Sequence, residues 1–209
     1  MKEKLFPALQ TYFEEREQEF NQISAERKEE LSLLSTYLSD KYQKGESPKL
    51  IVICTHNSRR SHMGQMWLAV GAEYIGLPPL TSYSGGTEAT AFNHRSVTAL
   101  RKSGLEIKSQ DEKVSNPVYE VCWKAEMEPY TAFSKKFSDS PNPSEAFAAI
   151  MVCSEADEAC PFVPGAEFRL ALPFEDPKAF DDTALEAGKY SERAAQIARE
   201  ILFALKEVS

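Results

Sequence analysis

The feature that most constrains the fold is a short apolar run, Leu50 to Ile53, which leads directly into Cys54. An unbroken run rich in β-branched residues is typical of a strand buried on both faces of a parallel sheet. A polar loop follows, and the stretch 61–71 then has helical periodicity. Its apolar side consists of Met63, Met66, Trp67 and Val70. Strand, loop and helix in this order predict the opening of an α/β unit.

The rest of the chain repeats this alternation. Three more strands are predicted, near residues 81–84, 148–153 and 168–172. Helices are predicted at about 93–103, closed by Gly104, and at 183–208. A mostly parallel sheet follows from the alternation. Residues 117–138 instead alternate aromatic and charged side chains, which favours a hairpin or an extension at a sheet edge.

The first 47 residues are interpreted as an extension made of two amphipathic helices. Apolar residues recur at helical spacing between residues 6 and 43, and Ser24 is suited to cap the second helix. The turn 45–48 ends that helix. We therefore predict a helical extension over 1–47 and a main α/β domain over 48–209, with an insertion around 115–145.

Composition limits the classes of partner. The chain has 209 residues, 42% of them hydrophobic, so it can bury one substantial core. Its formal net charge of -8 argues against nucleic acid or an anionic membrane as the principal partner. Apolar runs fall short of the roughly 20 residues that span a membrane, and the charged start at residues 1–4 does not resemble a signal peptide. We expect a cytoplasmic protein with reduced cysteines and neither metal nor cofactor.

The polar loop after the first strand is a candidate oxyanion site. It comprises Cys54, Thr55, His56, Asn57, Ser58, Arg59, Arg60 and Ser61. A tight loop before a helix N-terminus can point its N–H groups at an anion, and Arg60 can clamp two oxygens with its guanidinium. These donors favour the thiolate of Cys54, while Ser61 can donate to the sulfur and Asn57 can hold the loop. Alternatively, Cys54 is a buried small hydrophobe and both arginines are solvated.

The pattern Cys-x5-Arg-Ser after a first strand resembles the low-molecular-weight protein tyrosine phosphatase superfamily. Cys54, Asn57, Arg60 and Ser61 match its signature, and the similarity covers most of residues 49–207. It continues through the segments 83–88, 93–110 and 152–161, the pair Asp176-Pro177 and the final helix. The resemblance implies a flavodoxin-like fold, with a central four-stranded parallel sheet flanked by helices.

Two residues of the loop depart from that signature. His56 and Arg59 stand where the superfamily usually has Gly and a second Cys. If position 56 needs a positive φ, His costs about 1 kcal/mol more than Gly there.

Asp176 is the candidate general acid for protonating an oxygen that leaves the oxyanion. Pro177 restricts the backbone beside it, although an ordinary Asp-Pro turn is the simpler alternative. In the phosphatases an aromatic residue usually follows this pair, whereas Lys178 follows here. Glu175 before the pair is similar to the arsenate reductase branch.

The segment 152–161 is similar to the redox segment of thioredoxin-coupled arsenate reductases, in which two cysteines lie seven residues apart. Here they are Cys153 and Cys160. If the segment between them is helical, their positions are separated by about 10.5 Å along the axis. A disulfide needs α-carbons within roughly 7 Å, so the oxidised form requires this helix to open. Alternatively both thiols are inert, and the acidic residues nearby disfavour their thiolates.

Three functions are therefore compared. In an arsenate reductase, Cys54 attacks arsenate, Asp176 protonates the leaving oxygen, Cys153 and Cys160 complete a disulfide relay, and thioredoxin is the reductant. In a phosphatase, water cleaves a phosphocysteine and the relay is not needed. In a non-catalytic protein, the loop only binds an oxyanion and the N-terminal helices dock a partner.

Overall fold

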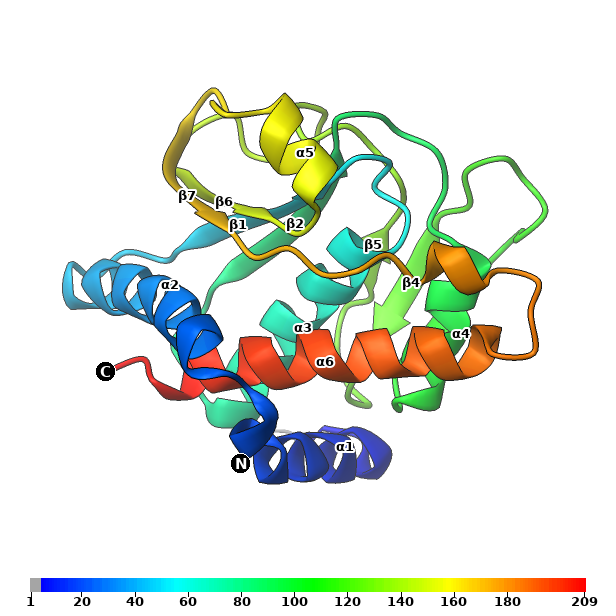
Figure 1. The fold of residues 1–209 in the computed structure, drawn as a ribbon, viewed down its shortest axis with the longest axis horizontal. Helices are drawn as coiled ribbons and strands as arrows, with labels where there is room; N and C mark the ends of the chain where they lie inside the picture. Colours follow the sequence, from blue (N-terminus) through cyan, green and yellow to red (C-terminus); the bar gives the residue numbers. More distant parts are fainter. Residues whose placement is uncertain (1–4) are drawn as a thin grey trace.

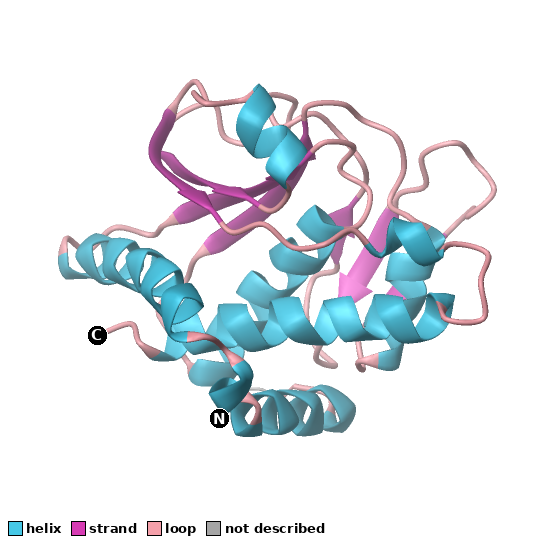
Figure 2. Ribbon diagram, viewed as in Figure 1, coloured by secondary structure: helices cyan, strands magenta, loops and turns pink. Residues whose placement is uncertain are grey.

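The centre of the fold is a four-stranded parallel sheet in the order β2-β1-β6-β7 (Figures 1 and 2). The computed structural model describes residues 5–209. The strands are β1 Lys49–Cys54, β2 Thr81–Gly86, β6 Phe147–Met151 and β7 Ala166–Ala171. β6 is buried throughout and β1 from its second residue on, as expected for strands covered on both faces. The predicted fold class is confirmed.

Helices cover the sheet. In Figure 1, α3 (Arg60–Ile75) and α6 (Glu186–Lys206) lie below the sheet and the short α5 (Ser154–Ala159) lies above it. α3 runs past Gly71, where the sequence suggested its end. A Cβ at Gly71 would lie 2.9 Å from Leu205 Cδ1, so this glycine allows α3 to pack closely on α6. The helix ends instead at Gly76, whose φ of 84° forms the left-handed cap.

The N-terminal helix pair packs on the main domain. α1 spans Pro7–Gln18, a 3-10 turn spans Phe20–Gln22, and α2 spans Ala25–Gln43. Ser24 caps α2 by accepting a hydrogen bond from Arg27 N. The apolar faces of both helices belong to the same buried cluster as the sheet, through Leu9, Phe13, Leu31, Leu34 and Leu38. The domain boundary predicted after residue 47 falls in the turn between α2 and β1.

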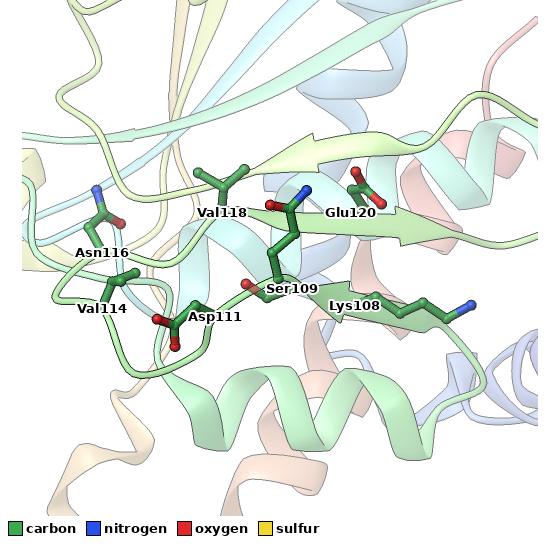
Figure 3. Close-up of a pocket in the computed structure, with 8 residues that line it drawn as sticks. Lys108, Ser109, Asp111, Val114, Asn116, Val118 and Glu120 are labelled. Atoms are coloured by element: carbon green, nitrogen blue, oxygen red, sulfur yellow. The ribbon is translucent and has the colours of Figure 1, made fainter.

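A second, antiparallel sheet lies beside the first. β4 (Tyr119–Cys122) and β5 (Tyr130–Ala132) form the predicted hairpin, and β3 (Glu106–Ser109) pairs with β4. β3 was not predicted because it has one buried residue, Ile107, and no apolar run. A pocket of about 500 Å³ opens along β3 and β4, lined in part by Val114 and Val118 (Figure 3). Its lining includes no residue of the Cys54 loop.

The remaining elements bring other chain segments beside that loop. α4 (His94–Lys102) is capped by Asn93, and a 3-10 turn (Pro177–Phe180) begins directly after Asp176. α6 starts three residues later than predicted, because Thr183 closes a turn on Phe180 O and caps Leu185 N through its hydroxyl.

Within residues 5–209 there is no helix long and apolar enough to cross a bilayer.

Candidate active site

The candidate nucleophile lies where β1 ends. Cys54 is buried, and its Sγ lies 3.0 Å from Ser61 Oγ, so the expected contact is present. The first intrahelical hydrogen bond of α3 runs from Met63 N to Arg59 O. The N–H groups of residues 60–62 precede it and have no intrahelical acceptor. A helix N-terminus with free donors therefore begins next to the sulfur, as an oxyanion site requires.

Asn57 determines the shape of the loop. It is fully buried, its Nδ2 donates to Ser61 Oγ (2.9 Å), and its Oδ1 accepts Lys135 N (2.9 Å). Its φ of 44° is the only left-handed value in the loop, so the expected backbone cost at His56 does not arise. Asn tolerates this conformation better than most residues. Asn57 therefore has two roles: it adopts the left-handed backbone conformation that the loop needs, and its side chain positions Ser61.

His62 forms the buried support beneath the loop. Its Nε2 lies 3.0 Å from Asn57 O and its Nδ1 lies 3.3 Å from Ser84 Oγ, while its ring stacks on Phe92. Burial lowers the pKa of His62 to about 3, with the positive charge of Lys135 as a further cause. The imidazole is therefore neutral at physiological pH and structural in role.

The segment 115–145, which the sequence predicted to be an insertion, contacts the loop directly. Ser134 Oγ donates to His56 O (3.2 Å) and accepts Thr90 N (2.8 Å), and Gly86 N donates to Lys135 O (2.9 Å). β2 approaches so closely that a Cβ at Gly86 would lie 2.6 Å from Thr55 O. These supports were not predicted, because nothing in the local sequence marks Ser134 or Lys135 as neighbours of the loop.

Arg60 points into the site rather than to solvent. It is buried, its Nη1 donates to Phe174 O (2.6 Å) and its Nη2 donates to Asp176 Oδ2 (2.7 Å). The structure thus brings together the predicted clamp and the predicted general acid. A bound oxyanion would compete with the Asp176 carboxylate for this guanidinium, because both accept the same forked donor.

The side chain of Arg59 is bound by protein groups rather than solvated. Its Nε donates to Tyr190 Oη (2.7 Å) and its Nη2 to Asp181 Oδ2 (3.1 Å), and Tyr190 Oη donates to Asp181 Oδ1 (2.6 Å). Burial, chiefly, raises the pKa of Tyr190, so its hydroxyl remains a donor. This closed triad fastens the end of the loop to α6 and to the segment after Asp176. Neither Tyr190 nor Asp181 carried a sequence signal.

Cys153 lies beside the Cys54 loop because β1 and β6 are neighbouring strands. Val152 N donates to Ile53 O (2.9 Å), and Cys153 Sγ lies 3.5 Å from Thr55 Oγ1. The pKa of Cys153 is raised, with burial as the main cause rather than the acidic neighbours we expected. Cys160 lies at the other end of α5, so the segment between the two cysteines is helical, and all four cysteines are free.

The comparisons with known proteins agree with this geometry. No family model matches the chain. An arsenate reductase of Brevibacillus brevis is 29% identical over 125 residues, covering 60% of this chain and 73% of the relative. One from Bacillus subtilis is 26% identical over 148 residues, covering 71% and 87%.

Solved structures show the same fold. A low-molecular-weight protein tyrosine phosphatase from T. tengcongensis aligns with a TM-score of 0.53 at 15% identity, covering 77% of this chain and 99% of that chain. A YwlE mutant from Bacillus subtilis aligns with a TM-score of 0.52 at 14% identity, covering 77% and 97%. The chain therefore shares the fold of low-molecular-weight protein tyrosine phosphatases. In sequence it is similar to curated arsenate reductases.

Proposed function

We propose that this protein is an arsenate reductase that uses Cys54 as nucleophile and Cys153 and Cys160 as a disulfide relay. The observation that supports this most directly is the position of Cys153. It follows β6, whose neighbour β1 ends in Cys54, and adjacent strands lie about 4.8 Å apart. A thiol that is to attack a sulfur on Cys54 needs this proximity.

In the first step we propose that Cys54 thiolate attacks arsenate held by the loop N–H groups and Arg60. An As–S bond forms, and Asp176 donates a proton to the departing oxygen, which leaves as water. Asp176 is well placed, since it lies within hydrogen-bond distance of the arginine that would hold the anion. We assign the oxyanion contacts to residues 55–61, with Arg59 acting through its backbone while its side chain fixes the loop.

In the second step Cys153 thiolate attacks the Cys54 sulfur. The As–S bond breaks, its electron pair reduces arsenic from the pentavalent to the trivalent state, and arsenite leaves. Because burial raises the pKa of Cys153, this thiol is protonated at rest and must lose its proton to attack. Cys160 thiolate then attacks Cys153, and Cys54 departs as a thiolate. We propose cytoplasmic thioredoxin as the reductant of the resulting Cys153–Cys160 disulfide.

Phosphomonoester hydrolysis is the second candidate, because Cys54, Arg60 and Asp176 also provide every group that a phosphocysteine pathway needs. That pathway uses neither Cys153 nor Cys160. The two functions therefore share the first step and differ in the relay.

Single cysteine variants separate them. Arsenate reduction coupled to thioredoxin and hydrolysis of p-nitrophenyl phosphate would be measured on the wild type and on Cys54→Ser, Cys153→Ser and Cys160→Ser. We expect Cys54→Ser to abolish both activities, and the other two to abolish arsenate turnover only. Cys122→Ser is the matched control, because Cys122 lies in β4 of the second sheet. Undiminished arsenate turnover in Cys153→Ser would reject the relay.

A further inference from the structure

The helix between the two relay cysteines has little to hold it in place. α5 has six residues, and only Ala156 is buried among them. Its N-cap, Cys153, makes no side-chain capping hydrogen bond. A helix this short does not persist without tertiary contacts. Whatever fixes its C-terminal end therefore determines how readily the segment opens.

One side chain outside the helix supplies that contact. Arg169, on β7, donates from Nε to Cys160 O (3.2 Å) and from Nη2 to Cys160 O (3.1 Å). The same Nη2 lies 3.0 Å from Asp157 O and 2.5 Å from Asp157 Oδ1. The guanidinium thus binds carbonyl groups at the C-terminal end of α5, where a positive charge is also favoured by the helix dipole. Arg169 is itself fixed by the pairing of β7 with β6, opposite Ala149.

We propose that Arg169 is a positioning residue that holds the relay helix closed in the reduced protein and must release it before Cys153 and Cys160 can join. This inference deepens the proposed function and rests on it. With α5 intact, the two cysteines are separated by about 10.5 Å of helix rise, so the helix has to unwind. Unwinding moves Cys160 and Asp157, which are the two residues that Arg169 binds.

The step itself needs no additional oxidant in the arsenate cycle. Cys160 thiolate attacks Cys153 in the Cys54–Cys153 disulfide, a new S–S bond forms, and Cys54 leaves as a thiolate. Arg169 loses its acceptors as the helix opens. When thioredoxin returns two electrons, the helix reforms and Arg169 binds it again. Arg169 therefore opposes the oxidised state and speeds recovery of the reduced one.

The test isolates the two relay thiols from arsenate chemistry. In a Cys54→Ser/Cys122→Ser background only Cys153 and Cys160 remain, and diamide can oxidise them by taking two electrons and two protons. Disulfide formation is followed by mass spectrometry, with hydrogen exchange of the α5 amides measured in parallel. Arg169→Gln removes the charge-assisted hydrogen bonds to the helix. Because the Arg169 side chain is 28% exposed, we expect a moderate effect: disulfide formation and α5 hydrogen exchange should each become about tenfold faster. Arg169→Lys keeps the charge without the fork and should lie between.

Matched variants guard against a general loss of stability. Arg199→Gln removes another well-packed arginine, on α6, which binds Gln22, and should leave both rates unchanged. Asp157→Asn weakens the contact with Arg169 from the helix side and should raise both rates about threefold. Combined with Arg169→Gln, its effect should be less than additive. Unchanged rates in both Arg169→Gln and Asp157→Asn would overturn the proposal. If wild type failed to reduce arsenate, the proposed function would fail, yet the diamide rates would still decide the role of Arg169.

Discussion

Replacing Asn57 should separate two contributions to stability, one from its side-chain amide and one from its left-handed backbone. Its amide joins Ser61 to Lys135 N, and its backbone is left-handed with φ of 44°. Asn57→Gly removes the amide but tolerates the backbone. Asn57→Ala removes the amide and adds a Cβ that disfavours this conformation.

The expected magnitudes follow from these contacts. Losing two hydrogen bonds and leaving the buried N–H of Lys135 without its acceptor should cost Asn57→Gly about 3 kcal/mol in free energy of unfolding. Asn57→Ala should lose about 1 kcal/mol more, from the left-handed backbone. Both variants also leave Ser61 Oγ without the donor that orients it beside Cys54, so hydrolysis of p-nitrophenyl phosphate should fall at least about tenfold.

Urea unfolding of the two variants provides the measurement. Asn116 is the matched control, because its amide makes a similar pair of bonds to Ser134 without a positive φ. At this position the Asn116→Ala variant should be at least as stable as the Asn116→Gly variant. If Asn57→Ala proved as stable as Asn57→Gly, the backbone argument would be wrong. If Asn57→Gly unfolded with nearly wild-type free energy, the hydrogen-bond argument would fail.

Two further predictions concern the supports of the loop. Gly86→Ala would place a Cβ 2.1 Å from Glu88 O, so the loop must shift and turnover of p-nitrophenyl phosphate should drop about a hundredfold. Gly188→Ala, where the added Cβ meets open space, should be silent, and equal turnover in both variants would refute the close-approach argument. His62 has a folded pKa of about 3 against 6.5, so its contribution to stability is complete above pH 6.5 and is lost as pH falls toward 3. Between pH 3 and 6.5 the free energy of unfolding, measured in urea, should change less with pH in His62→Gln than in the wild type. If both proteins showed the same pH dependence, a buried neutral imidazole would be contradicted.

The elements that could be predicted from sequence are those whose pattern is local. β1 is an unbroken apolar run, and α2 carries a recognisable cap at Ser24. β3 escaped prediction because it is held by pairing with β4 rather than by its own composition. Gly71 was misread as a helix end because its role is the approach of another helix. Local pattern therefore identified the main sheet and the β4–β5 hairpin, whereas β3 depends on its pairing with β4.

The candidate site shows the same division. The loop spacing pointed to Cys54 and Arg60, the superfamily resemblance added Asp176, and the structure brings the last two within hydrogen-bond distance. The partners of Arg59 were out of reach, since Tyr190 lies 131 residues away along the chain. Lys135, 78 residues from Asn57, contributes its backbone, which no residue type reveals. The catalytic roles of Cys54, Arg60 and Asp176 remain predictions.

The helix pair at the N-terminus also determines when the chain can finish folding. Arg27 on α2 binds Glu200 on α6 across 173 residues, and Ser35 donates to Ala204 O across 169. During synthesis α2 leaves the ribosome long before α6 exists, and its leucine-rich face then has no native surface to cover it. Such long-range pairing delays folding and prolongs exposure of apolar side chains. A segment made before α6 is therefore among the last to be secured.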